Sequence, residues 1–152
     1  MTLEEMYNIC EKKNRGKSAA TEHDLQVSCL RWLGYAHPKV FCYAIPNGAY
    51  TTKTFAKKLV AEGVKKGVPD LHFPIPRNGY ASLYIEMKNG KAGVVSAEQK
   101  AMIQKLQSLG NKVAVCRSLD DFMKEINQYF NDEENEYRQT QLEEVSQEQS
   151  SS

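Results

Sequence analysis

Three residues near the middle of the chain have the types and spacing that a hydrolytic metal site requires. Glu86 and Lys88 flank Met87 in a segment whose apolar neighbours predict a buried strand. Residues i and i+2 of a strand project from the same face, so the carboxylate and the ammonium group would point the same way. Charges on a buried strand cost free energy unless they are paired or bind a metal. By itself, however, a Glu-x-Lys pair is usually a plain ion pair.

Asp70 supplies a second carboxylate. It directly follows Gly67-Val68-Pro69 and begins a second predicted strand. A hairpin turn at Pro76-Arg77-Asn78-Gly79 would bring the start of this strand beside the end of the next, and so place Asp70 near Glu86. Two neighbouring carboxylates repel each other unless a cation joins them, and hard oxygen ligands favour Mg²⁺ or Mn²⁺ over zinc. The alternative is that Asp70 only caps the turn after proline and never meets Glu86.

The elements that must position these residues alternate along the chain. We expect helices over residues 21–33, 52–62, 96–109 and 118–130, and strands over 39–45, 70–75, 80–88 and 112–116. Gly34 is predicted to stop the first helix, and Asp121 to complete a capping box with Ser118 at the start of the last. The order favours an α/β domain in which one mixed sheet is flanked by helices.

With these elements in place, the sequence resembles the PD-(D/E)XK nucleases. Pro69-Asp70 is followed, 16 positions after Asp70, by Glu86-Met87-Lys88. The wider pattern is similar to the VRR-NUC family, the virus-type replication–repair nucleases, through Glu22, Pro46-Asn47-Gly48, Gly67-Val68-Pro69-Asp70 and Ser96-x-x-Gln99. The resemblance covers about residues 20–125. It implies a restriction-endonuclease-like αβββαβ sandwich with a central, mixed, four-stranded sheet.

The resemblance also implies a role for each signature residue. Asp70 and Glu86 would be ligands of Mg²⁺ or Mn²⁺, and the backbone carbonyl of Met87 would complete the site. Lys88 would orient or deprotonate the attacking water and stabilise the charge that develops on phosphorus. No small-molecule cofactor beyond the metal is expected.

Two further residues are implied in the site, and each has an ordinary alternative role. Glu22 would be an additional catalytic ligand, directly or through water, but acids in the first turn of a helix are favoured by the helix dipole anyway. Gln99 would fix Lys88 or a phosphate at the edge of the site. Because Gln99 lies three residues after Ser96, it also fits a capping box, and a capping side chain cannot freely contact Lys88.

Gln26 and His72 are weaker candidates. Gln26 lies one helical turn after Glu22, on the same face of the predicted helix. His72 shares a strand face with Asp70 and could approach a metal. A hydrogen-bonded structural histidine is the more ordinary role.

The charge of the chain is distributed unevenly. The net charge is +1, yet residues 131–152 carry seven acids and one base, which leaves +7 on residues 1–130. A basic body with an acidic, Gln/Ser-rich tail indicates a domain that binds a polyanion and a disordered appendage. The lysines expected to hold the nucleic-acid backbone are grouped around the predicted site: Lys53, Lys57, Lys58, Lys65, Lys66 and Lys91. For any one of them, a solvated surface role is the alternative.

Other features of the sequence lead us to expect a cytoplasmic protein. No apolar run approaches the roughly 20 residues that a membrane span needs, and Met-Thr-Leu-Glu-Glu lacks the pattern of a secretion signal. The four cysteines are scattered without a Cys-x-x-Cys pair, so reduced structural cysteines are expected.

The function implied by the resemblance is that of a metal-dependent, structure-selective DNA endonuclease. Stand-alone modules of this family resemble junction-resolving enzymes, so we expect a homodimer that cuts branched DNA such as Holliday junctions, with residues 1–20 as a candidate dimer contact. Within enzymes, flaps, nicks or RNA are alternative substrates. Two further possibilities stay open: a catalytically silent DNA-binding module of the same fold, and a small α/β interaction domain with surface ion pairs.

Overall fold

One mixed sheet organises the chain in the computed structural model, which describes residues 21–46 and 52–131. Its strand order is β1 (Tyr43–Ala44), β2 (Leu71–Phe73), β3 (Leu83–Met87) and β4 (Lys112–Cys116). Strand β2 runs antiparallel to both β1 and β3, whereas β4 runs parallel to β3. A parallel pair needs a crossover, which α4 (Ala97–Ser108) provides. The predicted α/β sandwich with four mixed strands is confirmed.

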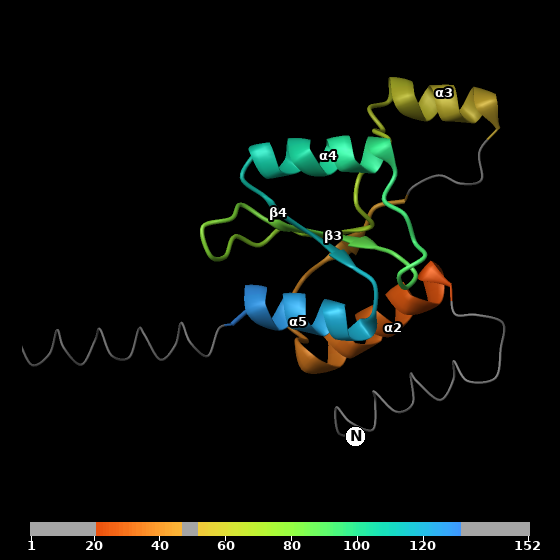
Figure 1. Ribbon diagram of the computed structural model, residues 1–152. Helices are drawn as coiled ribbons and strands as arrows, with labels where there is room; N and C mark the ends of the chain where they lie inside the picture. Colours follow the sequence, from red (N-terminus) through yellow and green to blue (C-terminus); the bar gives the residue numbers. More distant parts are fainter. Residues whose placement is uncertain (1–20, 47–51, 132–152) are drawn as a thin grey trace, which may run out of the picture.

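Helices cover both faces of this sheet (Figure 1). Helices α2 (Glu22–Ala36) and α5 (Leu119–Tyr129) pack on one face, and α4 lies on the other. The core forms between the sheet and the pair α2/α5 from alternate residues of β2 and β3 and from helix side chains: Leu71, Phe73, Leu83, Ile85, Met87, Trp32, Phe122 and Ile126. Because side chains alternate along a strand, His72, Tyr84 and Glu86 face the side of α4. No helix among the described residues has the length and hydropathy to cross a membrane.

Helix α3 (Lys53–Ala61) stands apart from these layers (Figure 1). Thr52 caps it by accepting a hydrogen bond from the amide of Phe55 at 3.3 Å. None of its residues is buried, and Phe55 and Val60 are about half exposed. The helix is therefore held mainly through its connections to the rest of the chain rather than by a packed face.

The β2–β3 hairpin turns as the sequence predicts. Arg77 and Tyr80 exchange backbone hydrogen bonds around Asn78 and Gly79, whose φ angles are 53° and 82°. Two consecutive positive φ angles are typical of the type I′ turn that suits a hairpin.

The first helix and the first strand differ in extent from the prediction, and the last helix differs in its cap. The strand expected over residues 39–45 is only Tyr43–Ala44. The first helix continues through Gly34 to Ala36, and it ends where Pro38 disfavours helical geometry at the preceding residue. At the start of α5 the hydroxyl of Ser118 accepts from the amide of Asp121, but the Asp121 carboxylate accepts from the amide of Arg117. The predicted capping box is thus only half formed.

Three predicted segments lie largely or wholly outside the described residues. They are the N-terminal extension 1–20, the Asn47-Gly48 part of the predicted turn, and the acidic tail apart from Asn131.

The loop between α3 and β2 packs closely on the start of α4. Gly67 has a φ of +79°, and a Cβ at this position would lie 2.7 Å from the carbonyl oxygen of Glu98. Only glycine allows both the positive φ and this approach. The close contact fixes the first turn of α4 against the loop that leads to Asp70.

We predict that Gly67→Ala lowers the free energy of unfolding by more than Gly63→Ala does. Gly63 also has a positive φ, +103°, but nothing lies within 4 Å of a Cβ added at that position. Backbone strain alone costs roughly 1–2 kcal/mol at each site, and the steric clash adds to it only at Gly67. Urea denaturation of the two variants measures the difference, and equal losses would contradict a tight contact with α4.

Candidate active site

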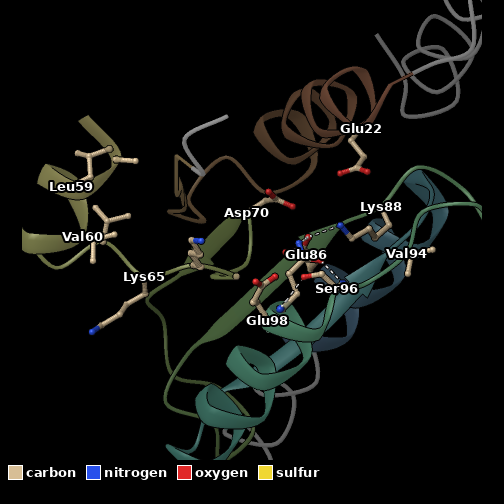
Figure 2. A pocket seen from close by; sticks show the side chains of 15 residues that line it. Glu22, Leu59, Val60, Lys65, Asp70, Glu86, Lys88, Val94, Ser96 and Glu98 are labelled. Carbon is tan, nitrogen blue, oxygen red and sulfur yellow. Dashed lines mark hydrogen bonds and ion pairs between the residues drawn. The ribbon is translucent and has the colours of Figure 1, made fainter. Parts of the chain in front are cut away.

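All the catalytic side chains predicted from the sequence line one pocket of about 600 Å³. In Figure 2, Glu22, Asp70, Glu86 and Lys88 converge on this pocket from separate elements. Glu22 comes from the start of α2, Asp70 precedes β2, Glu86 lies in β3, Lys88 follows it, and Gln99 is in the first turn of α4.

The β2–β3 register brings the two central acids together. Leu71 pairs with Ile85, so Asp70 stands opposite Glu86 one step further along the hairpin. The Asp70 side chain accepts a hydrogen bond from the amide of Met87 at 2.7 Å. Because β2 begins only at Leu71, the amide of Met87 has no backbone partner in β2, and the Asp70 carboxylate accepts its hydrogen bond instead. The alternative in which Asp70 lies far from Glu86 is excluded.

Glu86 is a buried carboxylate with an incomplete set of partners. Its side chain is 2% exposed. Its Oε1 atom lies 3.1 Å from the Lys88 ammonium and accepts a hydrogen bond from Gln99 Nε2 at 2.7 Å. Its Oε2 atom is buried without a hydrogen-bond partner among the described residues.

The electrostatics of the pocket disfavour the charged form of Glu86. Burial, followed by the nearby charge of Asp70, raises the pKa of Glu86 from 4.5 to about 7. The hydrogen bond and charge of Lys88 oppose this rise, and Glu22 adds a smaller contribution to it. The opposed carboxylates are the physical signature of a site that a cation would stabilise.

Lys88 is enclosed by the loop that follows β3. Its side chain is 8% exposed. Gly93 packs on its stem, since a Cβ at Gly93 would lie 3.0 Å from the Cβ of Lys88. Arg117 fixes this loop by donating to the carbonyls of Gly90 at 2.9 Å and Gly93 at 2.5 Å. Sequence reasoning missed Arg117, because nothing in its local pattern reveals carbonyl partners so distant along the chain.

Gln99 takes the capping role that its position suggests and adds a contact that the sequence did not predict. Its Oε1 atom accepts from the amide of Ser96 at 2.9 Å, which completes the capping box of α4. Its Nε2 atom is left to donate to Glu86. The contact expected with Lys88 is therefore replaced by one with Glu86, because the two ends of the amide serve different partners.

The remaining candidates take different positions. Glu22 is exposed at the mouth of the pocket, above Lys88 in Figure 2. Gln26 is half-buried and does not line the pocket. Both ring nitrogens of His72 are engaged, Nδ1 with the Tyr43 hydroxyl and Nε2 with Ser82 at 3.0 Å, and burial lowers its pKa. His72 is thus a structural histidine.

The predicted nucleic-acid-binding lysines fall into two groups. Lys65 and Lys66, in the loop after α3, line the pocket. The others, Lys53, Lys57, Lys58 and Lys91, are exposed and do not line it. Sequence reasoning also missed an apolar wall at this pocket, formed by Leu59 and Val60 of α3 with Val64 and Val94.

The donor set fits a hard divalent cation at Asp70 and Glu86. Both offer carboxylate oxygens, and Glu86 Oε2 has an unused acceptor site. Over residues 21–46 and 52–131, however, no three His, Cys, Asp or Glu side chains lie close enough to hold a metal ion. Glu22 would thus contribute through water or after a change of rotamer.

We predict that the metal-free protein loses stability as the pH rises from about 5 to 8. The native pKa of Glu86 is raised, so its contribution is fully present below the unfolded value of 4.5 and is lost as the pH passes about 7. The change is on the order of 3 kcal/mol. Urea denaturation in chelator measures it.

Glu86→Gln is the matched control for this measurement. It keeps the shape of the side chain and removes the titration, so the pH slope should largely disappear. An unchanged slope would assign the pH dependence to other groups.

Comparisons with known proteins found a matching family model and a similar solved structure. The family model described as the VRR-NUC domain matches residues 20–120. A solved structure titled "VRR_NUC domain protein" is similar with a TM-score of 0.64 and 26% identity, covering 76% of this chain and 92% of that one. No curated protein matches the chain.

Proposed function

Because this chain belongs to the VRR-NUC family of DNA-processing nucleases, we propose that it is a metal-dependent endonuclease that hydrolyses phosphodiester bonds in DNA. The observation that carries the proposal is the buried Glu86 carboxylate, opposite Asp70 and paired with Lys88. A purely structural ion pair would account for Lys88, but it would leave the opposed Asp70 and the unpaired Oε2 atom unexplained.

The residues of the pocket divide the work of hydrolysis. A bound Mg²⁺ or Mn²⁺ would supply charge neutralisation at the phosphoryl oxygens and a lower pKa for the attacking water. Asp70 and Glu86 would hold this ion, and the Met87 carbonyl is a further candidate ligand. The Lys88 ammonium donates hydrogen bonds toward the attacking water and the developing phosphoryl charge.

Other residues hold these groups in place or attract the substrate. Gln99 fixes the Oε1 side of Glu86, so that the Oε2 side stays available for the ion. Lys65 and Lys66 provide positive charge at the pocket for the DNA backbone.

We further propose that the substrate is branched DNA, such as a four-way junction, cut by a homodimer. One module of this size carries one such pocket within its described residues, and symmetric cutting of two strands needs two copies. The test is a panel of labelled four-way junction, flap, linear duplex and single-stranded DNA with Mg²⁺, with Mn²⁺ and with chelator. Cutting of another substrate would retain the nuclease and overturn the junction preference. Binding without cutting would indicate a silent DNA-binding module.

We predict that Lys88→Met lowers the cleavage rate by on the order of 100-fold or more. Methionine fills the space of the buried lysine stem but cannot donate to water or phosphate. DNA binding in chelator should be retained, which anisotropy measures alongside the cleavage assay.

Lys112→Met is a matched control for this variant. Lys112 is a partly buried lysine on β4 that pairs with Glu125 at 3.1 Å and does not line the pocket. Its replacement should leave cleavage unchanged. Equal losses in the two variants would indicate a general effect on folding rather than a role of Lys88 in the reaction.

Gln99→Glu should separate the two roles of Gln99. A glutamate at this position still completes the capping box, but it can no longer donate an amide hydrogen to Glu86. Cleavage should fall by about 10–100-fold, as measured under single-turnover conditions.

Ser96→Ala is the complementary variant. It removes the hydroxyl that caps α4 and costs about 1 kcal/mol of stability, while the Gln99 amide can still reach Glu86. Cleavage should therefore be nearly retained. If Gln99→Glu cleaved DNA at the wild-type rate, the contact between Gln99 and Glu86 would be dispensable for cleavage.

A further inference from the structure

An outward-facing row of large side chains precedes and enters β1. Val40 and Cys42 are partly buried and pack against the core. The alternate residues Lys39, Phe41 and Tyr43 are exposed, Phe41 to 61% and Tyr43 to 46%. Exposed and partly buried residues alternate here as in a half-buried strand. The solvent-facing side of such a strand usually carries polar side chains, but here it carries two aromatic rings.

The Phe41 and Tyr43 rings are supported by aromatic side chains of the neighbouring strands. The Phe41 and Tyr43 ring centroids are 6.2 Å apart. Tyr43 meets His72 edge-on at 5.2 Å and contacts its Nδ1 atom through the hydroxyl. His72 in turn stacks on Tyr84 with centroids 4.1 Å apart and planes 16° from parallel. The exposed pair is therefore the outer end of a continuous aromatic row across β1, β2 and β3.

This row lies beside the candidate active site on the same face of the sheet. Tyr43 pairs with His72, and His72 with Tyr84. Two positions further along their strands stand Asp70 and Glu86, which project from that same face. Two residues of a strand span roughly 6.6 Å, so the carboxylates and the aromatic row occupy neighbouring rows of the sheet.

We propose that Phe41 and Tyr43 form a stacking platform for unpaired bases of the DNA strand that enters the active site. This inference rests on the proposed nuclease function, because it takes the nucleic-acid substrate as given and identifies how a single-stranded part of it is held. Aromatic side chains stack on bases of any sequence. Lys39, exposed in the turn two residues before Phe41, supplies a contact to the nucleic-acid backbone, which favours nucleic acid over an apolar protein partner as the occupant.

The platform makes a prediction that phosphate contacts alone do not. The probes are fluorescein-labelled oligothymidylate, an abasic oligonucleotide of the same length, and a blunt duplex, with anisotropy measured in chelator. The wild-type protein should bind oligothymidylate more tightly than the abasic chain of equal charge. Phe41→Ala should weaken oligothymidylate binding by on the order of 10-fold and leave abasic and duplex binding nearly unchanged.

Two variants serve as matched controls. Tyr80→Ala removes an aromatic ring of similar exposure, 41%, from the β2–β3 turn, and it should change none of the three affinities. Tyr43→Phe keeps the ring but loses the hydroxyl contact with His72, so it should retain more of the preference for bases than Tyr43→Ala. Because Phe41 is largely exposed, Phe41→Ala should keep the wild-type circular dichroism spectrum and denaturation midpoint.

Each outcome bears on one proposal. Equal binding of oligothymidylate and the abasic chain by the wild type would overturn the platform, as would an equal loss for both probes in Phe41→Ala. If DNA is cut while binding is independent of bases, the platform alone fails. If binding depends on bases and on Phe41 but no DNA is cut, the platform stands and the nuclease proposal fails.

Discussion

The burial of one carboxylate determines how the elements around it are arranged. Glu86 occupies a strand position where a charged side chain is costly. Lys88 and Gln99 both contact its Oε1 atom, so the loop after β3 and the start of α4 must both lie close to it. Lys88 requires the enclosing loop held by Arg117. Gln99 requires the start of α4 to lie over the sheet, where Gly67 permits the close contact that keeps it there.

Much of the fold could be predicted because its elements have strong local signals. Ser96 and Gly110 mark the two ends of α4, and Asn78-Gly79 specifies the hairpin turn. The prediction was wrong where a local signal competes with its surroundings. Gly34 is tolerated inside α2 because a helix already capped and packed against the core can absorb one residue of low propensity. Asp121 has the spacing for a capping box, but the amide of Arg117 is its partner instead.

The site was predictable to the extent that it depends on strand geometry. Asp70, Glu86 and Lys88 meet because a tight turn fixes the register, and the turn is legible in the sequence. The double role of Gln99 was not predictable, since it depends on the position of α4 over β3. The apolar pocket wall from α3 was missed for a similar reason. Nothing local to residues 53–61 shows that their apolar side faces a pocket rather than the core.

The parallel pairing of β4 with β3 has a consequence for the order in which the site can assemble. The hairpin that joins Asp70 to Glu86 and Lys88 is local in sequence, so its closure entails a small loss of chain entropy. Docking of α4 and β4 needs a longer crossover and is intrinsically slower. During folding the two acids can thus meet in water before Gln99 and the helix enclose them. At that stage solvent screens the repulsion between the two carboxylates. The electrostatic cost of holding them together rises only later, when α4 and β4 dock on the hairpin and exclude water.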